Sequence, residues 1–269
     1  MSQYTLSFIG TGAMGSALAK AAVKNTPPEK ILLSNRTPEK AERLASALGC
    51  AAGSVTDAAE KAEYIFLGVK PQMMRELLSE IGPVLAKRSG RFVLVTMAAG
   101  LTIERIGELS GGMYPVIRIM PNTPCAAGAG MILYDANSLV TPEELDRFVA
   151  AMSGAGTLDR LEERLIDAGS AVAGCGPAFA CLFIEALADG GVACGLPRQK
   201  ALLYAAKMAE GTARLMQESG LHPGAMKDAV CSPGGSTIAG VRALEEHGFR
   251  AAAMDAVIAA AERTAELGK

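Results

Sequence analysis

One stretch decides the fold of this 269-residue chain: Leu6-Ser7-Phe8-Ile9-Gly10-Thr11-Gly12-Ala13-Met14-Gly15. Its first four residues indicate a strand, and the G-x-G-x-x-G run that follows opens an apolar helix over residues 14–23. At such a junction the first glycine permits a tight turn, the second lets a pyrophosphate approach the backbone, and the third lets helix and strand pack closely. Glycines also serve plain turns, but this position after the first strand predicts dinucleotide binding.

Outward from this junction, short apolar runs alternate with amphipathic stretches. The runs predict strands over residues 31–33, 64–69, 92–96, 116–120 and 130–133, and the amphipathic stretches predict helices over residues 39–48 and 73–85. This alternation indicates parallel βαβ units, and hence an α/β Rossmann domain with a doubly wound, mostly parallel sheet. A helix with Thr141 as its cap and Glu144 three residues on closes this domain.

The pattern changes near residue 160. From residue 163 to residue 268 nearly every segment has helical periodicity. The glycine-containing segment 154–159 separates the two patterns, and we place the domain boundary at residue 156. The sequence therefore predicts a nucleotide-binding domain over residues 1–156 and an all-helical domain over residues 157–269.

The composition excludes several classes of protein. Apolar residues make up 50% of the chain, charged residues 20%, and the net charge is −2, so no partner nucleic acid or anionic membrane surface is expected. Six cysteines without CxxC spacing and only two histidines indicate reduced thiols and no metal site. The N-terminus lacks the basic segment of a secretory signal, which favours a cytoplasmic protein.

The most apolar stretch covers residues 171–188. Gly174, Gly176, Pro177 and Glu185 interrupt it. These interruptions favour a helix buried in a core or in a subunit interface over a membrane span.

The end of the second expected strand indicates which dinucleotide is preferred. An NAD-selective site would place Asp or Glu there, to accept hydrogen bonds from the ribose 2′-hydroxyl. The strand ends instead in Ser34-Asn35-Arg36-Thr37. Arg36 can pair with a 2′-phosphate and its neighbours can donate hydrogen bonds to it, which predicts NADPH, with NADH as the weaker alternative. A solvated loop arginine is the competing interpretation.

Two more loops are expected at the carboxyl edge of the sheet, where open α/β folds bind ligands. They are Gly68-Val69-Lys70-Pro71 and Met97-Ala98-Ala99-Gly100, although either could be a simple turn. The predicted cofactor contacts are therefore Gly10, Thr11, Gly12, Ala13, Met14, Gly15, Ser34, Asn35, Arg36, Val69, Lys70, Pro71, Met97, Ala98, Ala99 and Gly100.

The helical half contains a second glycine-rich turn, Ser232-Pro233-Gly234-Gly235-Ser236-Thr237-Ile238. Two glycines before a helix start form a nest of N–H donors at the positive end of the helix dipole, which suits a small anion such as a carboxylate. A helix–helix turn capped by the Ser and Thr side chains fits the same residues equally well.

Resemblance decides between these interpretations. The second turn, followed by Leu244-Glu245, resembles the C-terminal motif of pyrroline-5-carboxylate reductases. The likeness extends over essentially the whole chain. It includes the first glycine-rich turn, Val69-Lys70-Pro71, Ala98-Ala99-Gly100, Arg118-Ile119-Met120-Pro121-Asn122-Thr123-Pro124 and Gly176-Pro177-Ala178-Phe179.

The resemblance implies NADPH-dependent reduction of the cyclic imine L-1-pyrroline-5-carboxylate to L-proline. It further implies a helical domain that forms a homodimer by interleaving helices, with decamers (pentamers of dimers) common in the family. The substrate would lie between one subunit's Rossmann domain and its partner's helical domain.

The resemblance also assigns site residues. The substrate would contact Gly234, Gly235, Ser236 and Thr237 through its carboxylate, and the Thr237 hydroxyl would face the ring nitrogen as the catalytic group. Glu163 matches an acidic position near the ligand, with Glu162 beside it as the alternative. This chain departs from the family at Cys175, where relatives usually carry serine.

Two rival functions share these features. A β-hydroxyacid dehydrogenase has the same domain layout but needs a helix-borne lysine, and neither Lys200 nor Lys207 has the expected glycine-containing context. A non-catalytic NADP-binding protein would have no reason to keep the second turn. His222, beside Pro223, is better explained as a helix-start residue than as a general acid.

Overall fold

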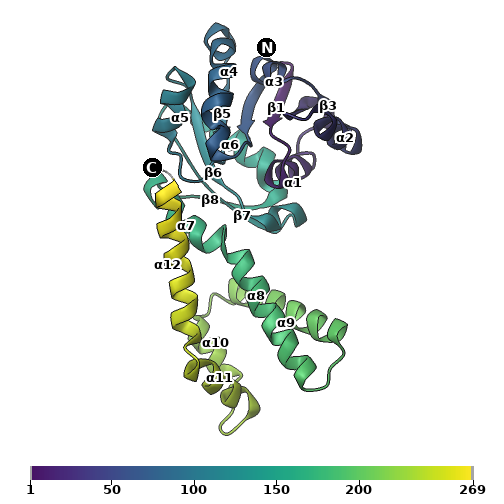
Figure 1. Cartoon of the computed structure of the whole chain (residues 1–269), viewed down its shortest axis with the longest axis vertical. Helices are drawn as coiled ribbons and strands as arrows, with labels where there is room; N and C mark the ends of the chain where they lie inside the picture. Colours follow the sequence, from purple (N-terminus) through teal and green to yellow (C-terminus); the bar gives the residue numbers. More distant parts are fainter. Residues whose placement is uncertain (1, 268–269) are drawn as a thin grey trace. The chain divides into compact units, whose positions relative to one another are not determined.

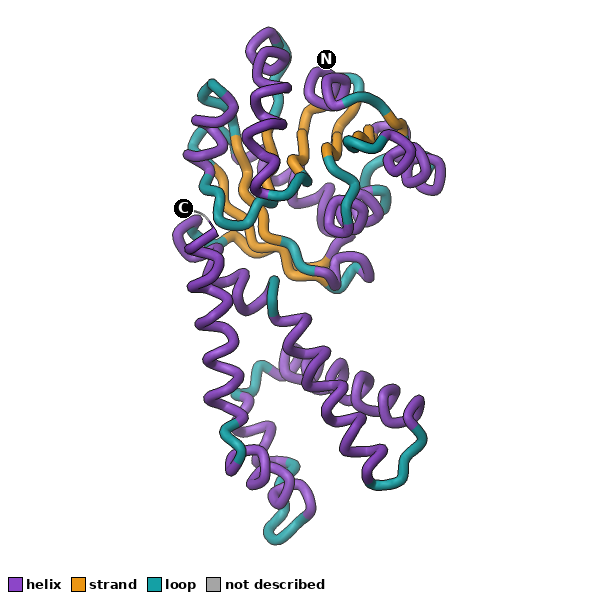
Figure 2. Tube along the Cα trace, viewed as in Figure 1, coloured by secondary structure: helices purple, strands orange, loops and turns teal. Residues whose placement is uncertain are grey.

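The computed structural model describes residues 2–267 and divides the chain into two compact units. One unit comprises Met1–Cys175 together with Ala260–Lys269, and the other comprises Gly176–Ala259 (Figure 1). Every strand among the described residues belongs to the first unit (Figure 2).

The first unit is built on one eight-stranded sheet with strand order β3-β2-β1-β4-β5-β6-β7-β8. The strands are β1 (Tyr4–Ile9), β2 (Ile31–Ser34), β3 (Ala51–Ala52), β4 (Ala62–Leu67), β5 (Val93–Thr96), β6 (Val116–Met120), β7 (Gly130–Ala136) and β8 (Gly156–Arg160). Neighbouring strands are parallel except for the antiparallel pair β6–β7. This order confirms the predicted doubly wound Rossmann sheet, in which ligands bind where the order reverses, beside β1 and β4.

Helices cover both faces of this sheet. They are α1 (Ala13–Ala22), α2 (Pro38–Leu48), α3 (Val55–Lys61), α4 (Met74–Lys87), α5 (Ile103–Ser110), α6 (Pro142–Met152) and α7 (Glu163–Ala173), with single-turn helices η1 (Pro28–Lys30), η2 (Pro71–Met73), η3 (Thr123–Ala127) and η4 (Ser153–Ala155) between them. Buried residues of α1, α2 and α6 join the core on one face, and those of α3, α4 and α5 join the core on the other.

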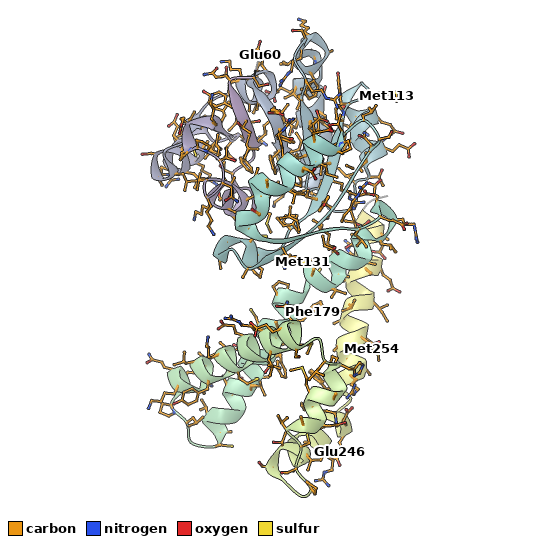
Figure 3. The ribbon with its side chains drawn as sticks, turned by 180° about the vertical axis from the view of Figure 1, so that it is seen from behind. Glu60, Met113, Met131, Phe179, Glu246 and Met254 are labelled. Carbon is orange, nitrogen blue, oxygen red and sulfur yellow. The ribbon has the colours of Figure 1, made fainter. Side chains whose placement is uncertain are left out.

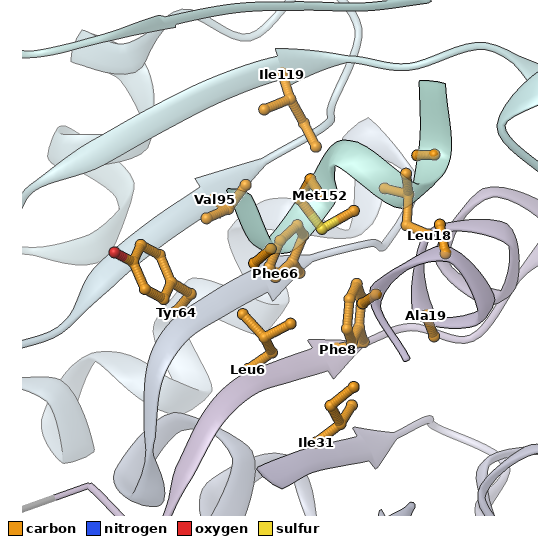
Figure 4. Packing of buried hydrophobic residues seen from close by; sticks show 14 of the residues in the cluster. Leu6, Phe8, Leu18, Ala19, Ile31, Tyr64, Phe66, Val95, Ile119 and Met152 are labelled. Atoms are coloured by element: carbon orange, nitrogen blue, oxygen red, sulfur yellow. The ribbon is translucent and has the colours of Figure 1, made fainter. Parts of the chain in front are cut away.

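The alternation of side chains along the strands explains the two cores. On β1, Leu6 and Phe8 face one core, whereas Ile9 faces the other. The rings of Phe8 and Phe66, on neighbouring strands, stack with centroids 4.4 Å apart, and Met152 of α6 lies near them (Figure 4). Both faces of each central strand are apolar, as is typical of a parallel sheet covered by helices.

The sheet of the first unit extends past the predicted domain boundary. The sheet continues through β8, which begins at Gly156, so the predicted boundary at residue 156 falls at the start of a strand. The compact unit itself runs on to Cys175. The predicted helix after Thr141 is confirmed: the Thr141 side chain accepts a hydrogen bond from the Glu144 N–H, and the Glu144 carboxylate accepts one from the Thr141 N–H.

The second unit contains helices with little core of their own. They are α8 (Gly176–Ala193), α9 (Arg198–Ser219), α10 (Pro223–Ala229), α11 (Ser236–Glu246) and the first part of α12 (Phe249–Leu267). Its buried cluster consists of alanines, Ala188 of α8 with Ala201 and Ala205 of α9. Large apolar side chains are exposed instead, among them Leu182 (69%) and Leu203 (63%). Met254 of α12 is 61% exposed (Figure 3).

The stretch 171–188 was predicted to be buried either in a core or in a subunit interface. It is mostly unburied within its own chain, so the first of these environments is not found. The apolar window that includes it lies within Glu163–Ala193 and is long enough to cross a membrane by composition, yet it is 11% buried. In the structure it comprises two helices, α7 and α8, separated by Gly174 and Cys175. Small residues meet between α8 and α9, and this leaves the larger side chains of α8 outside.

Candidate active site

The three glycines of the first glycine-rich turn have different surroundings. Gly10 has φ +103°, and a Cβ there would lie 2.7 Å from the Gly68 backbone. A Cβ on Gly15 would lie 2.0 Å from the Gly10 carbonyl oxygen, whereas nothing lies within 4 Å of one on Gly12. Gly12 precedes α1, which has no capping side chain and no acidic residue in its first turn. The turn therefore offers free N–H groups beside open space, as a pyrophosphate requires.

The turn is tied to the loop after β2. The Gly10 N–H donates to the Ser34 carbonyl (2.8 Å), the Thr11 N–H donates to Asn35 Oδ1 (3.1 Å), and Asn35 Nδ2 donates to the Thr37 carbonyl (3.1 Å). The Thr11 hydroxyl is buried and has no hydrogen-bond partner among the described residues. A buried hydroxyl without a partner costs about 1–3 kcal/mol, so a phosphate oxygen at the turn would be stabilised there.

The residues predicted to read the 2′-phosphate differ in accessibility. Arg36 is exposed, and among residues 2–267 no ion pair occupies its guanidinium. Asn35 is half-buried and Thr37 is exposed. Ser34 is 0% exposed and its hydroxyl lacks a partner, so it cannot reach a surface-bound phosphate without a local shift. The free positive charge of Arg36 at the end of β2 fits a 2′-phosphate.

Two further loops lie at the same edge of the sheet, after β4 and β5. The Gly68 N–H donates to the Ile9 carbonyl (2.7 Å), which brings the loop carrying Val69, Lys70 and Pro71 against the first turn. Gly68 opens this predicted loop, and a glycine at a strand end is the signal for such a close approach. The second loop, residues 97–100, ends at Gly100 with φ +75°.

The second glycine-rich turn also opens a helix. Gly234 has φ +70°, and the Gly235 N–H donates to the Ser232 carbonyl (3.0 Å). Gly235 directly precedes α11, which has no capping side chain and no acidic residue in its first turn. Ser236 and Thr237 are the first residues inside the helix, and both are exposed. The turn is thus not the plain capped turn of the competing interpretation, and its first N–H groups are available to an anion.

Glu163 lies at the first turn of α7, in the sheet unit. Its Oε1 accepts hydrogen bonds from the Ile103 N–H (2.6 Å) and from Arg118 Nη1 (3.4 Å), while its own N–H donates to Asp135 Oδ2 (2.8 Å). Arg118 also binds Asp167 one helical turn further on. The carboxylate is therefore held in place, and 27% of the side chain remains exposed for another partner.

Arg118 is the residue that the sequence interpretation missed. Its side chain is 2% exposed although the strand around it, Val116–Met120, is otherwise apolar and fully buried. An arginine inside such a strand is the available signal, because a buried charge needs partners.

His222, the cysteines and the metal-binding side chains are the remaining features that the sequence singled out. His222 caps α10, and its Nδ1 accepts a hydrogen bond from the Gly224 N–H (3.1 Å), which confirms it as a helix-start residue. Cys175 is half-buried after α7, and all six cysteines are free. No group of three or more metal-binding side chains occurs among the described residues.

Known proteins match both halves of the chain. A family model described as pyrroline-5-carboxylate reductase dimerisation matches residues 163–267, and one described as NADP oxidoreductase, coenzyme F420-dependent, matches residues 5–100. The pyrroline-5-carboxylate reductase of Escherichia coli (strain K12) is 39% identical over 267 residues, 98% of each chain. That of Pisum sativum is 38% identical over 98% of this chain and 96% of its own. The solved Plasmodium falciparum pyrroline carboxylate reductase with NADP bound is 29% identical, with 100% of both chains covered and a TM-score of 0.89.

Proposed function

This chain belongs to the pyrroline-5-carboxylate reductase family, and on that premise we propose how its two glycine-rich turns share the reaction. The reaction is the NADPH-dependent reduction of L-1-pyrroline-5-carboxylate to L-proline, the last step of proline biosynthesis. The observation that carries the proposal is the uncapped start of α1, where Gly12 faces open space between two tightly packed glycines.

The first turn and its neighbouring loops would hold NADPH. The turn, residues 10–15, binds the pyrophosphate through its N–H groups from Gly12 onward, and Arg36 with Asn35 binds the 2′-phosphate. Ser34, buried at the end of β2, joins them only if the strand end shifts. The loops 69–71 and 97–100 line the nicotinamide ribose. In this assignment the nucleotide belongs to residues 1–156, while residues 157–269 provide substrate binding and dimerisation.

The second turn would hold the substrate. Its carboxylate contacts residues 234–237 and binds the N–H groups of Ser236 and Thr237, where the positive end of the α11 dipole adds to the attraction. Glu163, whose Oε2 has no hydrogen-bond donor among the described residues, supplies a further polar contact. Thr237 holds the ring nitrogen through its hydroxyl.

The chemistry then needs few side chains. A protonated imine is already electrophilic, so the main task of the protein is alignment. NADPH, when bound, supplies the hydride. Thr237 would keep the ring nitrogen in place and relay a proton from water as the imine becomes an amine. Cys175, which stands where relatives usually carry serine, would be a weaker donor in the pocket.

Assembly and location complete the proposal. The chain forms homo-oligomers, in keeping with the dimerisation family that residues 163–267 match, and its substrate is a small molecule. We propose a homodimer that associates into a decamer and stays in the cytoplasm without membrane or nucleic-acid partners. The six free thiols suit a reducing compartment, and a second subunit would cover the exposed apolar side chains of α8 and α9.

One optical assay tests the function. NADPH oxidation is followed with pyrroline-5-carboxylate and, in parallel, with a panel of β-oxoacids, while NADP+ reduction is followed with the corresponding β-hydroxyacids. We expect turnover with the cyclic imine alone. Turnover with hydroxyacids would favour the dehydrogenase rival. That rival needs a catalytic lysine, whereas Lys207 is exposed and forms an ion pair with Glu210 (2.9 Å). NADPH binding without any turnover would favour the non-catalytic rival.

A further inference from the structure

The loop between β5 and α5, residues 97–102, has few bonds of its own. Apart from Thr102, which caps α5 with bonds of ordinary length, its hydrogen bonds among the described residues are long: the Leu101 N–H donates to the Ala98 carbonyl (3.4 Å), and the Ala98 N–H donates to Thr96 Oγ1 (3.4 Å). The shape of this loop, which is proposed to line the nicotinamide end of the cofactor, must therefore be set by what holds its two ends and its middle.

The two ends and the middle of the loop each contact β6 or α7. Before the loop, Thr96 is paired in register with Arg118 of β6. After it, the Ile103 N–H donates to Glu163 Oε1 at 2.6 Å. Between them, Ala99 packs in a small cluster that contains the fully buried Ile166 of α7.

Arg118 connects these anchors. Its guanidinium donates through Nη1 to Glu163 and through Nη2 to Asp167, two carboxylates on one face of α7. Only 2% of the arginine side chain is exposed, whereas its partners are 27% and 35% exposed. A buried guanidinium is stable only while it is paired, so Arg118 and the first turns of α7 must keep this arrangement together.

We propose that Arg118 is a positioning residue for the cofactor: through Glu163 it fixes residues 97–102 in the shape that accepts the nicotinamide half of NADPH. Arg118 is too deeply buried to touch the ligand itself. The inference rests on the proposed cofactor-lining role of residues 97–100, and it leaves the exposed part of Glu163 free for substrate.

The test compares the binding of NADPH with that of a ligand that lacks the nicotinamide half. Lysine in Arg118→Lys keeps the charge but cannot reach both carboxylates with one ammonium group. By calorimetry, the Kd of NADPH should rise about fivefold to tenfold, the effect of one lost hydrogen bond. The Kd of 2′-phospho-ADP-ribose, which lacks the nicotinamide half, should stay within about twofold of the wild-type value.

Asp167→Asn is the matched control. It neutralises the other carboxylate that pairs with the same arginine, but its amide oxygen can still accept from Nη2 and the bond between Glu163 and Ile103 is kept, so both ligands should bind as in the wild type. Amide hydrogen exchange over residues 97–103 should accelerate in Arg118→Lys and not in Asp167→Asn.

Three results would overturn the inference: equal weakening of both ligands in Arg118→Lys, no weakening of either, or the same profile in Asp167→Asn. If Arg118→Lys does not fold, Glu163→Gln serves instead, because its amide oxygen still accepts from Ile103 while its attraction to Arg118 is reduced. It should show the same ligand selectivity with a smaller change. These measurements need no substrate, so a failure of the proposed function would show itself separately, as a lack of NADPH oxidation by the wild-type enzyme.

Discussion

The two glycine-rich turns both open an uncapped helix, but their surroundings differ. Six residues of α1 are buried, and Gly10 and Gly15 of its turn lie against neighbouring backbone. By contrast, α11 has no buried residue, and a Cβ on Gly234 would meet nothing within 4 Å. The first turn is complete within one chain. The second offers the N–H groups of an anion site without walls around them, as expected of a site that an oligomer completes.

The largest expected effect tests whether the first turn is more tightly packed than the second. In Gly15→Ala the new methyl would lie 2.0 Å from a backbone oxygen, whereas in Gly235→Ala it would lie 2.4 Å from the Ser232 hydroxyl, which can rotate away. We expect Gly15→Ala to lose more than about 3 kcal/mol of stability, or to fail to fold, and to lose NADPH binding. Gly235→Ala should keep its Tm. Thermal unfolding of both variants decides the matter, and equal losses would contradict the contrast between the turns.

The next effect tests the chemical role of the second turn. Thr237→Ala should lower kcat by up to about 10²-fold, the usual cost of one well-placed donor. Because Thr237 is exposed at the start of α11, the circular dichroism spectrum and the NADPH Kd should not change. Thr237→Ser keeps the hydroxyl and should restore most of the turnover. Unchanged kinetics in Thr237→Ala would remove this residue from the mechanism.

A smaller effect should be confined to the first turn. Arg36→Ala should weaken NADPH by about tenfold, since a hydrogen bond to a charged group contributes roughly 1.5–3 kcal/mol and the site is open to solvent. NADH, which lacks the 2′-phosphate, should bind as before, and the KM for the imine should be unaffected. An equal loss for both cofactors would make Arg36 a plain loop residue.

The smallest effect should involve neither turn. Arg91 donates to both oxygens of Glu144 (2.7 and 2.8 Å), and this bonding holds the pKa of the carboxyl below its usual range. A lowered pKa adds stability that is present above the unfolded value of about 4.3 and is lost as the pH falls through the folded value. Glu144→Gln should therefore cost on the order of 1 kcal/mol at pH 7 in urea unfolding, because Arg91 is largely exposed.

The same variant has a clear acid signature. The difference in stability between Glu144→Gln and the wild type should shrink as the pH falls below about 4. NADPH affinity and turnover at pH 7 should match those of the wild type. A difference that persists unchanged at low pH would show that the packing of Glu144, rather than its charge, stabilises α6.

Local patterns predicted much of the sheet unit. Strands such as β2 and β5 begin with continuous apolar runs, and the glycine spacing indicated the two close contacts and the one open position that the structure has. The strand β8 was missed because Gly-Thr-Leu-Asp-Arg has no apolar run, as is possible at a sheet edge with little burial.

Features that depend on distant residues could not be found from local patterns. Arg118 meets carboxylates 45 and 49 residues away, and no local pattern indicates that pairing. The burial of Ser34 likewise depends on tertiary packing over the end of β2. Apolar composition identified the stretch 171–188 as a surface that needs cover, but composition does not say whether that cover comes from the same chain.

Synthesis exposes the apolar surface of α8 and α9 before a second chain can meet it. The ribosome releases the strands of the sheet unit first, and the helices with outward Leu182 and Leu203 follow. A newly made subunit therefore depends on the local concentration of its own kind, and on chaperones, to avoid aggregation. Polysomes that hold many nascent copies close together would shorten the time before two subunits meet. The yield of soluble enzyme should therefore rise with the number of ribosomes per messenger RNA until assembly saturates.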